Sequence, residues 1–303
     1  MRYLYLSSYP NVFRAMTGLH VVEFDELVRD VQPQYAEAER TRLSRPGRKR
    51  DIGAGHPFAL TERDQILLTV VWLRVYPTQE VLGYLFGVSD SAARSAVERV
   101  LPVLEQAGRD TMRLPDPGRK RRRKLDDLLR DTPELAVVID SFEQRVQRPR
   151  DKTQADALYS GKKKAHTLKS QVAVDEDTGR FVDVSESVAG PTADIALLEQ
   201  SALMQRLPDG VGGIGDLAYV GIPKLGLGAA PRRKPRGQSR PPDDVAYNTA
   251  FSKRRIIVEH SIGRLRRYQA LSQTDRHHRC HHTARVRAVA GLVNRQFRHR
   301  LPC

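Results

Sequence analysis

The segment Glu134-Leu135-Ala136-Val137-Val138-Ile139-Asp140 decides how the rest of this chain is interpreted. Five apolar residues run from Leu135 to Ile139 without a polar break, and Pro133 comes shortly before them. A short apolar run rich in β-branched residues predicts a strand that is buried on both faces. Because an unpaired buried charge is costly, Asp140 at the end of this run is a candidate for chemistry at the carboxyl edge of a sheet. The alternative is an aspartate that only caps the following turn.

Two later segments place acids in comparable positions. Residues 211–214 predict a second short strand, with Asp216 just after it, and residues 254–267 have apolar side chains at helical spacing around Glu259. Converging carboxylates repel one another unless divalent cations neutralise them, and ligation by oxygen alone suits Mg²⁺ or Mn²⁺. Two such ions stabilise the attacking and leaving oxygens of phosphoryl transfer. We therefore expect the carboxyl groups of Asp140, Asp216 and Glu259 to lie within metal-bridging distance of one another.

Residues 60 to 107 predict three helices in the order of a helix-turn-helix domain. Thr61 is expected to cap the first helix, residues 79–86 form a short second helix, and Ser89 caps the third after a turn at Gly87. Exposed positions on the third helix are suited to contact base edges or phosphates. These positions are Ser91, Arg94, Ser95 and Arg99. The alternative is a helical bundle without DNA contact.

The charge of the chain indicates its class of partner. With 303 residues the chain is long enough for two domains, and its net charge of +15 favours a polyanion, with nucleic acid as the first choice. Two cysteines make no disulfide framework, so we expect a reducing cytoplasm. No apolar run approaches the roughly 20 residues that span a bilayer, and the N-terminus lacks a signal-peptide pattern, so we expect no membrane association.

Two basic segments are candidates for contact with the nucleic acid backbone. Residues 119–124 are six consecutive cations between the helical region and the first strand, and they form either a solvated linker or a backbone-tracking segment. The second segment leads into two strands, residues 170–174 and 181–187, that a turn connects. Its candidate DNA contacts are Lys162, Lys163, Lys164, His166 and Lys169. The alternative for these lysines is a hairpin edge protected by charge.

The remaining segments carry weaker expectations. Residues 1–45 predict one or two helices, residues 192–207 a helix before the second acid-bearing strand, and residues 284–297 a closing helix on the sheet. Residues 231–244 predict a polar, proline-rich loop. Histidines and one cysteine cluster at residues 277–282, but their spacing matches no standard zinc site, so we expect no zinc there.

In combination these segments resemble the catalytic core of bacterial insertion-sequence DDE transposases, in the compact branch that lacks a large insertion before the final Glu. The resemblance rests on the order and spacing of six blocks: LTERDQILLTVVWLR, LFGVSDSAARSAVERV, VVIDSFEQ, YSGKKKAHTLKSQVAVDEDTGR, GDLAYVG and RRIIVEHSIGRLRRY. The family's Arg-x3-Glu-x6-Lys/Arg signature is met by Arg255, Glu259 and Arg266. The chain departs from the family at Leu217-Ala218, where Lys-Gly is usual, and at Ala193, where His is usual.

The resemblance implies a fold and a set of domains. It implies an α/β fold: a ribonuclease H-like mixed sheet with helices on both faces, preceded by an all-α helix-turn-helix domain. We expect an N-terminal helical segment at 1–46, a helix-turn-helix domain at 47–118, a basic linker at 119–133 and the catalytic domain at 134–303.

The resemblance also implies an activity. A transposase of this family would bind terminal inverted repeats in double-stranded DNA as a homo-oligomer, with a dimer on DNA expected. It would cleave the phosphodiester and join the 3′ hydroxyl to target DNA, with Asp140, Asp216 and Glu259 holding two Mg²⁺ or Mn²⁺ ions. Arg255 and Arg266 would steady the carboxylates or the scissile phosphate. Two alternatives stay open: a catalytically inactive DNA-binding protein, and a nuclease of the same fold that cuts without joining.

Overall fold

A computed structural model describes residues 1–44, 58–120, 125 and 127–297. The chain forms two compact units. Unit 1 contains residues 1–110, 267–272 and 287–303, and unit 2 contains residues 111–266 and 273–286. Residues 45–57 and most of the cation run at 119–124 lie outside the described residues. The domain boundaries drawn from the sequence therefore stay predictions.

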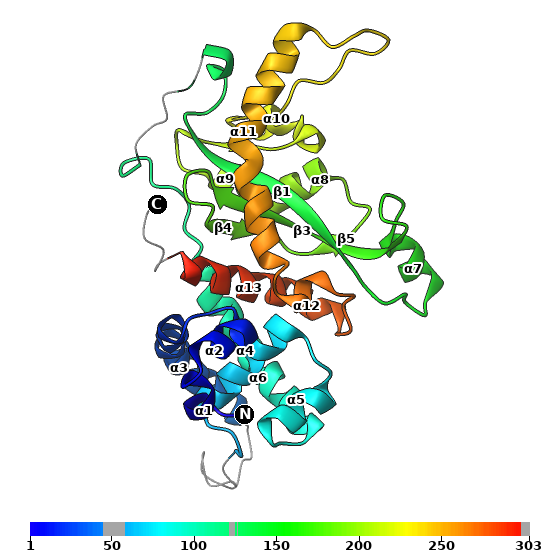
Figure 1. Cartoon of the computed structure of the whole chain (residues 1–303). Helices are drawn as coiled ribbons and strands as arrows, with labels where there is room; N and C mark the ends of the chain where they lie inside the picture. The colour runs from blue at the N-terminus through cyan, green and yellow to red at the C-terminus, as the bar shows by residue number, and fades with distance from the viewer. Residues whose placement is uncertain (45–57, 121–124, 126, 298–303) are drawn as a thin grey trace. The chain divides into compact units, whose positions relative to one another are not determined.

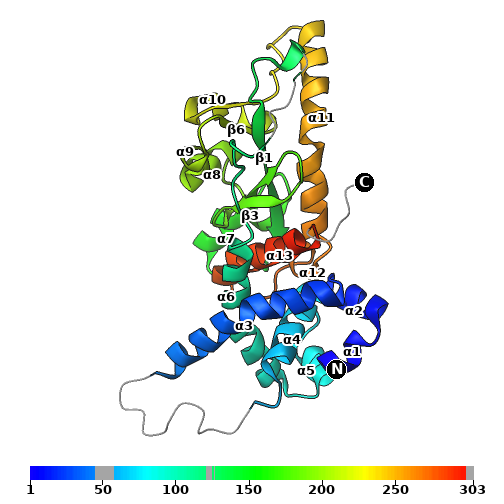
Figure 2. The same cartoon turned by 90° about the vertical axis from the view of Figure 1, so that its left-hand side faces the viewer.

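The N-terminal part of unit 1 contains three helices rather than the one or two that the sequence predicted. They are α1 (Tyr3–Ser7), α2 (Pro10–Thr17) and α3 (Val21–Leu43). The breaks between them have local causes. Pro10 occupies the first turn of α2, where its missing N–H costs nothing, and Gly18 ends that helix with a φ of 77° that favours glycine. In Figure 2, α3 is the long blue helix beside α4 and α6.

The helix-turn-helix arrangement follows in α4 (Glu62–Val75), α5 (Gln79–Phe86) and α6 (Asp90–Arg109). Thr61, Thr78 and Ser89 each accept a hydrogen bond from a backbone N–H in the first turn of the helix that follows. Gly87 ends α5 in the left-handed region, with a φ of 64°. The three helices, both predicted caps and the turn are therefore confirmed.

Two later stretches of the chain complete unit 1. They are α12 (Gln269–Ser272) and residues 287–296 of α13 (His282–Gln296). Helices α6 and α13 approach closely at Gly108 and Gly291, where a Cβ on Gly291 would lie 2.3 Å from the Gly108 Cα. An ion pair at 3.1 Å between Arg287 and Glu105 lies beside this crossing. The closing helix predicted at residues 284–297 is thus present, but most of it belongs with the N-terminal helices.

Unit 2 is built around a mixed sheet of seven strands in its described residues. The main order is β2-β3-β1-β6-β7, and β4 and β5 also pair with β3. Strands β1, β6 and β7 run parallel, whereas β2, β4, β5 and β1 are antiparallel to β3. The bounds are β1 (Leu135–Arg145), β2 (Tyr159–Ser160), β3 (Ala165–Asp175), β4 (Phe181–Val184), β5 (Val188–Ala189), β6 (Val211–Ile214) and β7 (Gly228–Ala229).

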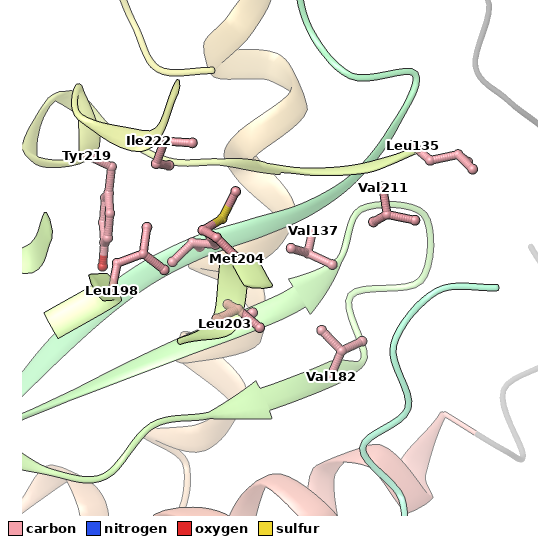
Figure 3. Packing of buried hydrophobic residues seen from close by; sticks show 11 residues of the cluster. Leu135, Val137, Val182, Leu198, Leu203, Met204, Val211, Tyr219 and Ile222 are labelled. Atoms are coloured by element: carbon pink, nitrogen blue, oxygen red, sulfur yellow. The ribbon is translucent and has the colours of Figure 1, made fainter. Parts of the chain in front are cut away.

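One face of this sheet carries the main hydrophobic cluster of unit 2. Alternate residues of β1, among them Val137 and Ile139, pack with Leu198, Met204 and Ile222 (Figure 3). The helices on this face are α8 (Asp194–Ser201), α9 (Leu203–Arg206) and α10 (Ile222–Leu225). The single helix predicted at residues 192–207 is thus divided into two. The division falls at Ala202, whose φ of 50° is incompatible with a continuous helix.

Helix α11 (Pro242–Leu265) crosses the opposite face, as Figure 1 shows in orange. Arg254 anchors it, because this buried guanidinium donates to both carboxylate oxygens of Glu176, to the Thr132 hydroxyl and to the Pro133 carbonyl at 2.6–2.9 Å. The helix begins earlier than the sequence indicated. Residues 242–244 were expected in a loop, but Pro242 is suited to the first turn of a helix.

The shorter elements of unit 2 are α7 (Lys152–Leu158) and three 3-10 turns: η1 (Asp127–Leu129), η2 (Leu217–Tyr219) and η3 (Arg279–His281). The strand predicted at residues 170–174 extends from 165 to 175, and the one predicted at 181–187 ends at Val184. None of the described helices is long and apolar enough to cross a membrane.

Candidate active site

The first two candidate acids both follow the end of one strand pairing. Strand β1 pairs in parallel with β6, and Val138 is opposite Ile214. Asp140 and Asp216 each come two residues after this last pair, so both follow the point where the β1–β6 pairing ends. They are near enough that the charge of Asp216 raises the pKa of the Asp140 carboxyl. Asp216 follows the end of β6 and accepts a hydrogen bond from the Ala218 N–H at 2.9 Å.

The sequence correctly predicted that Asp140 lies at an edge of the sheet, but it did not predict why. It predicted that the first strand ends at Asp140, whereas β1 continues through Asp140 to Arg145. The strand is long because β3 pairs with it as far as Arg145. This pairing involves residues far away in the sequence, so the apolar run of β1 does not reveal it. The carboxyl edge exists on the other side of β1, where the pairing with β6 ends at Val138.

The Asp140 carboxylate lies on the face of the sheet that α11 covers. Ile139 belongs to the cluster on the α8 face, and side chains alternate along a strand, so Asp140 points the other way. The Arg255 guanidinium of α11 is 4.0 Å from the Asp140 carboxylate, and the Asp140 side chain is 21% exposed. The pKa of the Asp140 carboxyl is raised to about 6. Burial is the largest cause, the charges of Asp216 and Asp194 also raise the pKa, and the Ser141 N–H and Arg255 lower it.

A fourth acid, Asp194, lies near this pair, and sequence analysis assigned it no role. Its carboxylate accepts a hydrogen bond from the Ser141 hydroxyl at 2.5 Å and lies 3.0 Å from the Lys169 ammonium. Burial, followed by the charges of Asp194, Asp140 and Asp216, raises the pKa of the Tyr219 phenol well above its usual value. In the sequence, Asp194 directly follows Ala193, the position at which His is usual in the family that the chain resembles.

Glu259 lies one helical turn after Arg255, so the two side chains lie on the same flank of α11. Since the Arg255 guanidinium approaches Asp140, this flank is on the Asp140 side of the sheet. The Glu259 side chain is exposed. Among the described residues, no group of three or more acids, histidines or cysteines lies close enough to hold a metal ion. The structure therefore brings two of the three predicted ligands near each other, and the expected convergence of all three is not seen.

Side chains at residues 277–282 contact one another or other parts of the protein. His282 is fully buried, and its ring nitrogens hydrogen-bond to Ser187 and Gln144 at 2.7 and 2.9 Å. His278 and the exposed Cys280 contact each other, with 2.8 Å between Nδ1 and Sγ. The rings of His278 and His282 thus contact other side chains of the protein.

The four predicted contacts on the third helix fall into two groups. Ser91 and Arg94 are exposed, Ser95 is half-buried, and Arg94 forms an ion pair at 2.8 Å with the exposed Glu98. Arg99 is half-buried, donates to the side-chain amide oxygen Oε1 of Gln65 at 2.9 Å and stacks on the ring of Phe58. The side chains of Ser91, Arg94 and Ser95 are the ones presented near the start of α6.

The candidate DNA contacts around the second basic segment also divide into exposed and buried side chains. Lys162, Lys163 and Lys164 are exposed in the turn between β2 and β3, and the half-buried His166 lies against the Tyr159 ring. Lys169 is buried in the sheet, where it pairs with Asp194 and donates to the Thr192 carbonyl at 2.5 Å. Arg266, the last member of the predicted signature, is exposed and follows the end of α11.

Comparison with known proteins agrees with this arrangement. Residues 139–294 match the family described as DDE superfamily endonuclease, and residues 58–110 match the helix-turn-helix of DDE superfamily endonuclease. The first match covers more than half of the chain and contains all three candidate acids. The chain therefore belongs to the DDE superfamily of endonucleases, and α4 to α6 form its helix-turn-helix.

Similar proteins narrow the comparison. A protein of Microchaete diplosiphon that carries the name of a transposase for insertion sequence element IS702 is 27% identical over 93% of this chain and 93% of its own length. A protein of Streptomyces albus G that carries the name of a putative transposase for insertion sequence element IS112 is 27% identical over 88% of this chain and 87% of its own length. The resemblance to insertion-sequence DDE transposases with an N-terminal helix-turn-helix is thus confirmed. No solved structure matches the chain.

Proposed function

We propose that this protein is a transposase that binds the terminal inverted repeats of its element, cleaves the phosphodiester there and joins the freed 3′ hydroxyl to target DNA. The observation that carries the proposal is that Asp140 and Asp216 both follow the end of the parallel β1–β6 pairing, with Arg255 of α11 approaching Asp140, in a member of the DDE endonuclease superfamily. The mixed sheet with helices on both faces is consistent with a ribonuclease H-like catalytic domain, and the four-part domain division drawn from the sequence belongs to the same proposal.

The residues at this edge suit Mg²⁺ or Mn²⁺. Asp140 and Asp216 supply carboxylate oxygens, the donors that hard divalent cations prefer, and the raised pKa of Asp140 reflects a buried acid with too little positive charge nearby. When bound, divalent cations supply the charge that stabilises the attacking and leaving oxygens of phosphoryl transfer. Glu259, on the adjacent flank of α11, is proposed to complete the ligand set once its side chain turns toward Asp140.

The chain's own residues orient the DNA around these acids. Within the described part of the chain, Arg255 has a buried Nε without a partner and a terminal nitrogen 4.0 Å from Asp140, so it has donors to offer to a phosphate. Arg266 is exposed and available for the backbone. Ser91, Arg94 and Ser95 are proposed to contact the element end, and Lys162, Lys163, Lys164 and His166 to follow the DNA backbone. An element with two inverted ends would engage two copies, so we propose a dimer on DNA.

The proposal is tested with the purified full chain and a DNA fragment that carries the sequences flanking its gene, where imperfect inverted repeats are expected. Incubation with Mg²⁺ should produce nicks at the repeat ends and strand-transfer products, both absent with a chelator. Asp140→Asn and Asp216→Asn should abolish both products while leaving the gel shift of the DNA unchanged.

The outcomes separate the rival functions. Nicks without strand transfer would identify a nuclease that cuts without joining. A normal gel shift without any nicking by the wild-type chain would identify a DNA-binding protein without catalysis. Nicking by Asp140→Asn at the wild-type rate would refute the site assignment.

A further inference from the structure

Asp194 links the two central strands of the sheet to helix α8. The Ser141 hydroxyl of β1 donates to its Oδ1 at 2.5 Å, and the Lys169 ammonium of β3 lies 3.0 Å from the same oxygen. Lys169 also donates to the carbonyl of Thr192, just before α8. The side chains of Lys169 and Asp194 are 8% and 19% exposed, so solvent screens this pair only weakly. A buried pair with additional hydrogen bonds resists displacement, because breaking it leaves an uncompensated charge.

This network lies where β1 loses a neighbour. On its β6 side, β1 has a strand partner only from Leu135 to Val138 within the described residues. Asp140 and Ser141 come directly after that point, so the pairing with β6 does not fix them. The Ser141–Asp194 hydrogen bond is a tether on that open side.

The tether acts on the residue next to the candidate metal ligand. The Ser141 N–H donates to the Asp140 carboxylate at 2.8 Å. Consecutive side chains of a strand point to opposite faces, so a rotation of the strand that moves Ser141 also turns Asp140. Holding Ser141 on the α8 face therefore fixes the direction of the Asp140 carboxylate on the α11 face.

We propose that Asp194, acting through Ser141, is a positioning residue that aims the Asp140 carboxylate for metal binding and phosphodiester cleavage. The inference rests on the proposed function of Asp140. Groups that orient a metal ligand from behind typically contribute a factor of about 10–100 to metal affinity or rate. Lys169 in turn fixes the Asp194 carboxylate through their ion pair. The role of this buried lysine is therefore within the protein and not in DNA contact.

The test compares Ser141→Ala with Ser141→Thr, which restores a hydroxyl. A matched control is Asp183→Asn, because Asp183 of β4 forms a similar partly buried pair with Arg206 of α9 at 2.8 Å, with its side chain 14% exposed, and this pair joins β4 rather than β1 to a helix. For each full-length variant, kcat and KM for nicking of repeat-end DNA are measured at varied Mg²⁺. The rise in melting temperature that Mg²⁺ causes in the absence of DNA is a readout independent of activity.

Ser141→Ala is expected to lower kcat about 10–100-fold, leave KM for DNA unchanged and diminish the Mg²⁺-induced rise in melting temperature. Ser141→Thr should restore both kcat and the metal response. Asp183→Asn should lower the melting temperature without changing kcat or the metal response. Asp194→Asn, which leaves Lys169 uncompensated, should show the Ser141→Ala defect with a larger loss of stability.

Two results would overturn the inference. One is a Ser141→Ala chain with wild-type kcat and a wild-type response to Mg²⁺. The other is a Ser141→Ala chain that only melts earlier, as the Asp183→Asn control does, which would make the network purely structural. Failure of the proposed function is distinguishable from both, because then Asp140→Asn itself would retain wild-type nicking.

Discussion

Asp140 and Asp194 are two acids in one region of the sheet, and their surroundings are opposite. Asp194 has a hydroxyl donor at 2.5 Å and an ammonium at 3.0 Å. The Asp140 carboxylate accepts a hydrogen bond from the Ser141 N–H, and the Arg255 guanidinium lies 4.0 Å away. The pKa of Asp140 is raised to about 6, mainly by burial. Buried charges in folded proteins are normally paired. The acid whose charge the protein leaves poorly compensated is therefore the one suited to bind a cation.

The same contrast separates two consecutive residues of α11. Arg254 is buried and donates to Glu176, Thr132 and Pro133, so each of its guanidinium nitrogens is used within the protein. Arg255 has a buried Nε without a partner among the described residues, and its guanidinium approaches Asp140 at 4.0 Å. One arginine fixes the helix on the sheet, and the other is available to a ligand. The predictions below test this division between satisfied and unsatisfied charges.

The largest effect is expected from Glu259→Gln. This change keeps the volume and the helix propensity but removes a charged ligand, so nicking in Mg²⁺ should fall to background, more than about 10³-fold, or about 4 kcal/mol in the barrier. Folding should survive because Glu259 is exposed, and the gel shift of repeat-end DNA should be normal. Without metal the variant should melt at least as high as wild type. Nicking at the wild-type rate would remove Glu259 from the site.

Arg254→Met should destabilise the chain by about 3–5 kcal/mol, because it removes the guanidinium that pairs with both oxygens of the buried Glu176 carboxylate. Arg255→Met is the matched control on the same helix, and it should reduce nicking with a much smaller loss of stability. Urea unfolding gives the free energy for both variants. Equal stability losses would contradict the division drawn here between the two arginines.

The buried His282 should make stability fall in mild acid. Burial lowers its pKa from 6.5 to about 3 in the folded chain, with a smaller contribution from Arg285. Between pH 6.5 and pH 3, His282 is therefore protonated in the unfolded chain but neutral in the folded chain. The stability attributable to neutral His282 is complete above pH 6.5 and is lost as pH falls toward 3, by up to about 1.4 kcal/mol per pH unit.

Unfolding measured from pH 7 to pH 5 tests this expectation. His282→Gln retains hydrogen-bonding groups for Ser187 and Gln144 but does not titrate, so its stability should depend less on pH. The exposed His260→Gln serves as the control and should keep the wild-type slope. Identical slopes for wild type and His282→Gln would show that this histidine does not cause the acid sensitivity.

The smallest effect is expected at the surface of α6. Arg94→Ala removes an exposed side chain whose ion-pair partner, Glu98, is also exposed, so folding should be unaffected. Binding to the element end should weaken about tenfold, with altered sequence preference, if the side chain contacts a base. Equal weakening on random DNA would indicate a phosphate contact instead. Arg99→Ala is the contrast, because its side chain is used inside unit 1 and its loss should lower stability first.

Local sequence patterns determined the elements that carry the function. The apolar run before Asp140, the caps at Thr61 and Ser89 and the turn at Gly87 predicted the strand and the helix-turn-helix, because strands and helix ends depend on neighbours within a few residues. The sequence also singled out Asp140 and Asp216 as acids that follow apolar strands.

Only the tertiary structure decided which side chains meet. The β1–β6 pairing that ends just before Asp140 and Asp216, the tether from Ser141 to Asp194 and the burial of Lys169 beside the exposed Lys162–Lys164 turn all depend on residues far apart in sequence. A lysine has the same local pattern whether it faces solvent or a buried carboxylate. Its environment follows from packing between elements, which the periodicity of a single segment does not encode.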